Sequence, residues 1–186
     1  MKRIALFFGS FNPIHNGHIH IAHEVLRHQK ADEVHFVLSP QNPHKSETEL
    51  LAEKHRLNML QLALEKHKNL IPNDIELHLS KPSYTAKTLK KLVTDNPTVE
   101  YVLLLGADNE AQLHTWDDAS YLMQFPRYVY PRKGVVLTES SLKMTFLDVE
   151  LQEISATKIR SIKNLRALKK WLPEPVMEYI EAHRLF

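Results

Sequence analysis

Apolar and polar residues follow two different periods along this chain, and the first change of period lies near the N-terminus. Residues 4–8 form a continuous apolar run, which predicts a buried strand. Ile19, Ala22 and Val25 then recur at three-residue spacing, as one face of a helix that begins near Gly17. The sequence therefore opens with a predicted strand, a short loop and a helix.

The same change between strand and helix patterns recurs to the end of the chain. Further strands are expected at residues 33–38, 75–79, 101–105 and 127–130, and helices over 49–67, 85–92, 154–160 and 165–186, with two short helices before 127. Residues 140–149 fit a strand or a loop. This alternation predicts an α/β fold, a doubly wound Rossmann-like parallel sheet with helices on both faces. We expect a single domain over 1–186 with a small helical C-terminal part at about 155–186.

Residues 9–18 (GSFNPIHNGH) connect the first strand to the first helix. Unpaired backbone N–H groups at a helix N-terminus attract anions, so this loop is a candidate phosphate site. It lacks the Gly-Lys-Ser/Thr of a Walker loop and the three glycines of a dinucleotide fingerprint. His15 and His18, three residues apart, can instead direct two imidazole N–H groups toward one phosphate. Taken singly, each could be an ordinary surface histidine.

A second candidate phosphate segment is residues 154–160 (ISATKIR). Ser155 before a helix could be an ordinary N-cap. However, the hydroxyls of Ser155 and Thr157, fresh helix N–H groups and the cation Arg160 together suit a triphosphate.

These two segments resemble the motifs of the HxGH nucleotidylyltransferases, in which both histidines contact the phosphates of ATP or CTP. The later segment resembles the Ile-Ser-x-Thr-x-x-Arg motif of that superfamily, with Ala156 where many members have serine. Asp108 could bind a ribose hydroxyl or cap the helix that follows it. The resemblance implies an ATP site formed by Gly9, Ser10, Phe11, His15, His18, Gly106, Asp108, Ser155, Thr157 and Arg160.

Three further segments, residues 82–89, 106–109 and 115–116, look like those of the bacterial nicotinate-nucleotide adenylyltransferases. That resemblance implies a pyridine ring stacked on Trp116 and its carboxylate held by backbone N–H groups at Thr85, a plausible N-cap, and just after Trp116. Asp117 stands where many members carry a second aromatic residue, and its charge would repel the ring carboxylate. Lys45 and Arg132 match basic positions that approach substrate phosphates in that family.

The implied reaction joins the AMP part of ATP to nicotinate mononucleotide and releases pyrophosphate, by in-line attack without a covalent enzyme intermediate. Within it, His18 is expected at the α-phosphate, His15 along the phosphate chain, and Ser155, Thr157 and Arg160 at the departing pyrophosphate. Mg²⁺ is expected to arrive with ATP, and no carboxylate pair indicates a dedicated metal cage.

Composition narrows the remaining alternatives. Cysteine is absent, which excludes thiolate chemistry and suits a cytoplasmic protein, and the net charge of +2 gives no argument for nucleic acid. No apolar window is long enough for a membrane span.

Three alternatives stay open. They are a related enzyme acting on nicotinamide mononucleotide or phosphopantetheine, an ATP-binding module without turnover, and a metal-binding protein that uses the twelve histidines. A zinc site from His15, His18 and His20 lacks a fourth ligand, and we expect His20, His23 and His28 to be exposed.

Overall fold

A six-stranded parallel sheet forms the centre of the computed structural model, which describes residues 1–40, 50–137, 143–150, 154–162 and 164–186. The strand order is β3-β2-β1-β4-β5-β6. The strands are β1 (Arg3–Gly9), β2 (Glu33–Leu38), β3 (Leu70–Asn73), β4 (Glu100–Gly106), β5 (Arg127–Tyr130) and β6 (Met144–Phe146). Chain progression reverses between β1 and β4, and ligands of doubly wound sheets bind beyond the strand ends at such a point.

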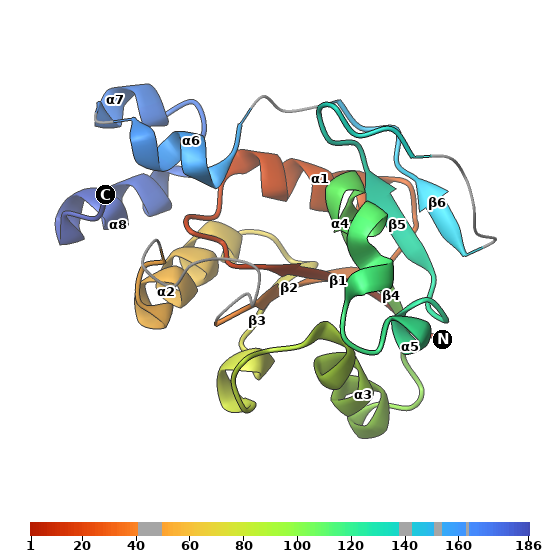
Figure 1. The fold of residues 1–186 in the computed structure, drawn as a ribbon. Coiled ribbons are helices and arrows are strands. Elements are labelled where there is room, and N and C mark those ends of the chain that lie inside the picture. Colours follow the sequence, from red (N-terminus) through yellow and green to blue (C-terminus); the bar gives the residue numbers. More distant parts are fainter. Residues whose placement is uncertain (41–49, 138–142, 151–153, 163) are drawn as a thin grey trace.

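Helices cover both faces of this sheet, as Figure 1 shows with α1 on one side and α3 on the other. One face packs against α1 (Asn16–Arg27) and α2 (Glu53–Leu64). The helices α6 (Ala156–Ser161), α7 (Leu165–Leu168) and α8 (Glu174–His183) extend the same hydrophobic core, with α8 against α2. The opposite face packs against α3 (Thr85–Asp95), the short helix η3 (Leu113–Thr115) and α5 (Ala119–Leu122). The remaining helices are η2 (Ile75–His78) and α4 (Ala107–Gln112).

The central strands read as continuous apolar runs because both of their faces are buried. In β1, Ala5 and Phe7 point into the core under α1, whereas Ile4 and Leu6 point into the core under α3. All four side chains are at most 5% exposed. This arrangement confirms the predicted doubly wound fold and places the loop after β1 at the switch point.

The prediction of an edge strand at residues 75–79 is wrong. The alternation of Ile75, Glu76 and Leu77 belongs instead to the 3-10 helix η2, in which Leu77 N–H donates to the Asp74 carbonyl at 2.8 Å. Glu76 is buried and accepts a hydrogen bond from the Thr88 hydroxyl, so the alternation does not divide buried from exposed positions. The edge strand beside β2 is β3, in which Pro72 pairs in register with Phe36 of β2.

Two helix boundaries differ from the prediction. The helix expected over 49–67 is confined to α2, and residues 41–49 lie outside the described part of the chain. Thr85 is the first residue of α3 rather than its cap, because Tyr84 occupies the N-cap position.

Residues 144–146, which the sequence left open between strand and loop, form β6. Among the described residues, no helix is long and apolar enough to cross a membrane.

Candidate active site

The two histidines of the β1–α1 loop lie against each other at the start of α1. His15 is the N-cap residue, and its ring stacks on that of His18 with centroids 3.6 Å apart. The backbone N–H of His15 donates to His18 Nδ1 at 3.3 Å. Because Nδ1 accepts this bond, the proton of neutral His18 lies on Nε2, so this ring offers a single directed donor.

His15 is neutral at physiological pH. Its side chain is only 5% exposed. Burial, together with the nearby positive charge of Arg132, lowers the pKa of His15 to about 3. Among the described residues, its buried Nδ1 has no hydrogen-bond partner. An incoming phosphate oxygen would therefore meet a neutral imidazole, which acts as a hydrogen-bond donor rather than as a fixed cation.

The two predicted phosphate segments, distant in sequence, meet at Gly17. A Cβ added to Gly17 would lie 3.1 Å from both His15 Nδ1 and Ile154 Cγ2, so any larger residue would push these two neighbours apart by a few tenths of an ångström. Ile154 also lines a narrow cavity of about 30 Å³ together with His15, His18 and Arg132. From α6, Arg160 Nη1 donates to the Asn12 carbonyl at 2.9 Å. The structure thus brings both segments to one place.

The hydroxyls of the second segment sit at the exposed start of α6. Ser155 is the N-cap, and its Oγ accepts a hydrogen bond from the Lys158 N–H at 3.2 Å. Thr157 Oγ1 accepts a hydrogen bond from Arg160 Nη2 at 3.4 Å. Ser155 therefore has the ordinary capping role, and Arg160 ties its own helix to the first loop.

Gly106 and Asp108 at the end of β4, with Arg132 just after β5, form a third part of the candidate site. Gly106 takes the N-cap position of α4, so Asp108 is not the cap. Asp108 Oδ1 lies 3.3 Å from Arg132 Nε, and a Cβ on Gly106 would lie 2.4 Å from Asp108 Oδ1. The missing side chain of Gly106 therefore leaves room for this ion pair. Through the pair, Arg132 is held beside His15 and the narrow cavity.

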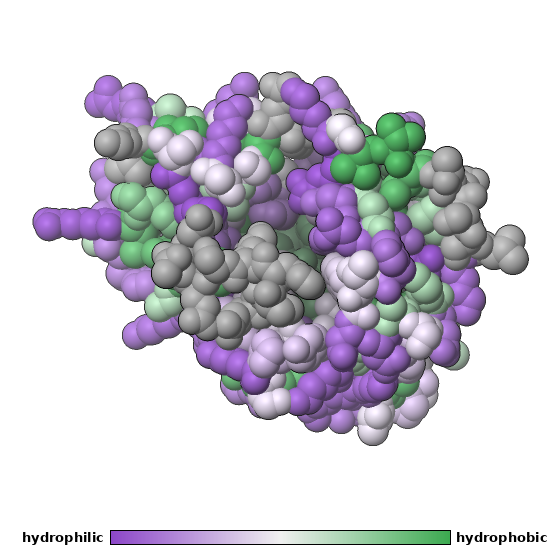
Figure 2. Space-filling model, viewed as in Figure 1, coloured by the Kyte–Doolittle hydropathy of each residue, from purple (hydrophilic) through white to green (hydrophobic). Residues whose placement is uncertain are grey.

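A larger cavity of about 380 Å³ opens on the other side of the β1 end. Thr85 and Trp116, predicted from sequence to hold the acceptor, both line it, and so does Gly9. Trp116 is half-buried, packed against the core under α3. Figure 2 shows a hollow near the middle of this face of the molecule, with hydrophilic side chains along much of its rim. Gly9 is thus the point at which the cavity predicted to hold the acceptor adjoins the β1–α1 loop.

Two carboxyl groups line the cavity that contains Thr85 and Trp116. Asp117 is exposed at its wall, where the sequence predicted repulsion of an anionic ring substituent. Glu76, which the sequence analysis missed, is buried, and Thr88 Oγ1 donates to its Oε1 at 2.7 Å. Burial raises the pKa of Glu76, against the opposing effect of nearby hydroxyls. A glutamate within an alternating pattern gives no signal of burial, so sequence reasoning could not find it.

The remaining predicted site residues are Phe11, Ser10 and Lys45, and they differ in what the structure shows of their side chains. Phe11 has a buried ring that packs edge-on against His18, so only its backbone can face a ligand. Ser10 is half-buried, and its carbonyl accepts a hydrogen bond from Arg56, a buried arginine that the sequence analysis also missed. Lys45 lies outside the described residues.

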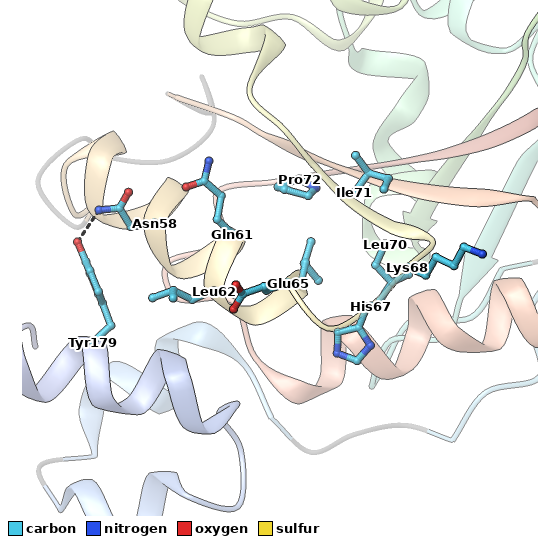
Figure 3. Close-up of a pocket in the computed structure, with 11 residues that line it drawn as sticks. Asn58, Gln61, Leu62, Glu65, His67, Lys68, Leu70, Ile71, Pro72 and Tyr179 are labelled. Carbon is cyan, nitrogen blue, oxygen red and sulfur yellow. Dashed lines mark hydrogen bonds between the residues drawn. The ribbon is translucent and has the colours of Figure 1, made fainter.

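A cavity of about 670 Å³ lies away from all these motifs, between α2, β3 and α8. Figure 3 shows Asn58 and Tyr179 hydrogen-bonded at one end of it and His67 and Lys68 at the other.

His23 and His28 are exposed as expected, whereas His20 is half-buried. In the described part of the chain, no three His, Asp or Glu side chains are placed to hold a metal ion.

Proteins of known family resemble this chain over almost its whole length. The sequence model of the cytidylyltransferase-like family matches residues 6–162. A protein of Christiangramia forsetii named probable nicotinate-nucleotide adenylyltransferase is 38% identical, with 97% of this chain and 96% of that protein aligned. A protein of the same name from Bacteroides thetaiotaomicron is 36% identical, over 97% of this chain and 92% of that protein.

Solved structures agree on the fold. The Plasmodium falciparum nicotinic acid mononucleotide adenylyltransferase complexed with NaAD is 21% identical and superposes with a TM-score of 0.85, over 100% of this chain and 97% of that one. A putative nicotinate-nucleotide adenylyltransferase from Vibrio parahaemolyticus gives a TM-score of 0.69 at 18% identity, over 98% and 93%. Together with the sequence relatives, these findings show that the chain belongs to the cytidylyltransferase-like family and, within it, to the nicotinate-nucleotide adenylyltransferases.

Proposed function

We propose that this protein transfers the adenylyl group of ATP to nicotinate mononucleotide, giving nicotinate adenine dinucleotide and pyrophosphate in NAD biosynthesis. The observation that carries the proposal is the position of Gly9, which lies between the histidine loop and the cavity lined by Thr85 and Trp116. An acceptor seated in that cavity would present its phosphate toward the loop. The full-length similarity to nicotinate-nucleotide adenylyltransferases supports the choice of acceptor.

The reaction needs positioning more than it needs a protein nucleophile. A phosphate oxygen of nicotinate mononucleotide attacks the α-phosphorus of ATP in line, and the bond from that phosphorus to the oxygen bridging to the β-phosphate breaks. Holding two anions in this geometry can supply ~7–11 kcal/mol, whereas one directed donor to developing charge supplies ~2.7–4 kcal/mol. Alignment of the two substrates is therefore the larger contribution.

The chain's own residues divide these tasks. His18 Nε2–H is proposed to donate to the α-phosphate, and His15 to the phosphate chain beside it. Arg160 and the α6 N-terminus, with Ser155 and Thr157, are proposed to hold the departing pyrophosphate. In this structure Arg160 donates to the Asn12 carbonyl and to the Thr157 hydroxyl. To contact pyrophosphate, its guanidinium would either use its remaining N–H groups or replace one of these two bonds.

Mg²⁺ is proposed to enter as part of the substrate, bound to ATP. An octahedral ion that keeps several waters needs few protein ligands, and its charge would offset that of the phosphates during transfer.

The test is a coupled assay of pyrophosphate release with purified protein and Mg²⁺. ATP and CTP are each paired with nicotinate mononucleotide, nicotinamide mononucleotide or phosphopantetheine. We expect turnover with ATP and nicotinate mononucleotide, and a much lower kcat/KM for every other pair. Faster turnover with another acceptor would reassign the substrate. ATP binding by calorimetry without pyrophosphate release from any pair would instead identify a binding module.

A further inference from the structure

Arg56 occupies an unusual position for an arginine. It lies on α2 and is 1% exposed, among the largest fully buried side chains of the described residues. Among the described residues, its guanidinium forms no ion pair with a carboxylate. It donates instead to four backbone carbonyls, at 2.7 to 2.9 Å. These carbonyls belong to Leu51, Ser10, Ser39 and Pro40.

Two of these carbonyls lie on the two loops that border the candidate active site. Arg56 Nη1 donates both to Ser10 of the β1–α1 loop, at 2.9 Å, and to Ser39 after β2, at 2.7 Å. Ser39 lines the acceptor cavity. A planar guanidinium fork holds several oxygens in fixed directions, which an ammonium group or an apolar side chain cannot do. Arg56 therefore couples the phosphate loop to the wall of the acceptor cavity.

The bond to Ser10 also fixes the direction of the next backbone N–H. The peptide bond between Ser10 and Phe11 is trans, so the Phe11 N–H points opposite to the Ser10 carbonyl and hence away from Arg56. Among the described residues, no acceptor is found for this N–H. A directed N–H without a protein partner, in a loop beside His18, is suited to an anionic oxygen.

Phe11 itself is strained and needs support from both sides. Its φ is 40°, in the left-handed region that a residue with a side chain adopts only when its surroundings impose it. Arg56 holds the carbonyl before it, and Arg160 holds the carbonyl of Asn12 after it. The two arginines thus hold the turn from α2 and from α6.

We propose that Arg56 is a positioning residue for adenylyl transfer, which holds the Ser10 carbonyl so that the Phe11 N–H donates to the nucleotide phosphates. This inference rests on the proposed function. Arg56 does not touch substrate; it acts through the backbone of the loop.

The test compares Arg56→Lys and Arg56→Met with Leu64→Ala. Leu64 is buried on the same helix, eight residues or about 12 Å further along, and its truncation also destabilises the protein. At a temperature where all variants are folded, we expect kcat to fall by at least ~10-fold in both Arg56 variants, more in Met than in Lys, since a small misplacement of reacting groups costs up to ~10²-fold. Leu64→Ala should lower Tm by a similar amount, yet its kcat should stay within about twofold of the wild-type value. Arg56 variants with wild-type kcat and wild-type ATP affinity would overturn the proposal.

A second measurement separates this proposal from the proposed function. The chain has seven phenylalanines, so ¹⁵N-phenylalanine labelling gives few amide signals, and Phe11→Leu assigns that of Phe11. In the wild-type protein the Phe11 amide signal should shift on addition of Mg²⁺-ATP, and it should be displaced in Arg56→Lys without nucleotide. An unchanged Phe11 signal in both experiments would refute the role of Arg56 even if turnover is observed. A wild-type shift without turnover would leave Arg56 in place and reject the enzyme assignment.

Discussion

Arg160 donates a hydrogen bond of 2.9 Å to the carbonyl of Asn12, across 148 residues of sequence. The bond ties α6 to the β1–α1 loop, so the segment expected to hold the departing pyrophosphate and the loop expected to hold the α-phosphate form one continuous wall. Substitutions on either side of this wall should therefore affect the same chemical step.

His18→Ala should lower kcat by ~10²–10³, because it removes one directed donor to charge that develops at the α-phosphate. The KM for ATP should change much less. The measurement is steady-state pyrophosphate release, with circular dichroism to confirm folding. His28→Ala, at an exposed position at the end of the same helix, is the matched control and should behave as wild type. Near-normal turnover of folded His18→Ala would remove His18 from the chemistry.

Gly17→Ala should lower kcat by about 10-fold or more with a modest loss of stability. The added methyl would lie 3.1 Å from both Ile154 and His15, so the two phosphate segments must separate slightly, and sub-ångström changes in alignment are costly. Steady-state kinetics and thermal unfolding measure the two effects. An unchanged kcat would mean that the contact between the segments has no role in transfer.

Asp117→Asn should raise kcat/KM for nicotinate mononucleotide severalfold while leaving that for the amide nearly unchanged. It removes a negative charge from the cavity wall, and charges about 4 Å apart interact by ~1–4 kcal/mol near a protein surface. The ratio of the two kcat/KM values is the readout. Equal effects on acid and amide would show that Asp117 does not face the ring substituent.

Trp116→Ala should raise the KM for the mononucleotide by ~10-fold or more through loss of its stacking surface, with the KM for ATP little changed. The same assay, run at saturating ATP and then at saturating acceptor, separates the two values. A parallel rise in both KM values would indicate a general disturbance of the fold rather than loss of an acceptor contact.

His15 should make the protein sensitive to acid. Its pKa is lowered from 6.5 to about 3 in the folded chain, so only the unfolded chain takes up this proton as the pH falls from about 6.5 toward 3. The stability present above pH 6.5 is therefore lost over that range, by up to ~1.4 kcal/mol per pH unit. Urea unfolding at pH 7, 6 and 5 measures the loss, and His15→Gln should flatten the profile. Parallel profiles for the two proteins would contradict the buried neutral state of His15.

The parts of the fold that sequence predicts well are those whose burial is complete or whose spacing is regular. β1 and β4 are apolar on both faces, and α1 keeps one apolar stripe, so each is visible in the pattern. β3 is short and contains Pro72 and Asn73, which are poor strand formers, and its place at the edge depends on pairing with β2.

The candidate site divides in the same way. The histidine loop and residues 154–160 carry their own signals, because phosphate chemistry needs those residue types at those spacings. Arg56 and Glu76 do not, since a charged residue in a helical or alternating pattern normally indicates an exposed face. Their burial results from distant carbonyls and hydroxyls that only the folded chain brings to them.

Pro72 has a consequence for how molecules of this protein meet one another. Asn69 O accepts the Val34 N–H, so the alternation of the parallel ladder turns the backbone of Pro72 toward the outer edge of the sheet rather than toward β2. A strand of a neighbouring molecule that extended the sheet at this edge would face the proline ring at a position where it needs a backbone N–H donor. The one missing hydrogen at this position discourages edge-to-edge aggregation along that side of the molecule.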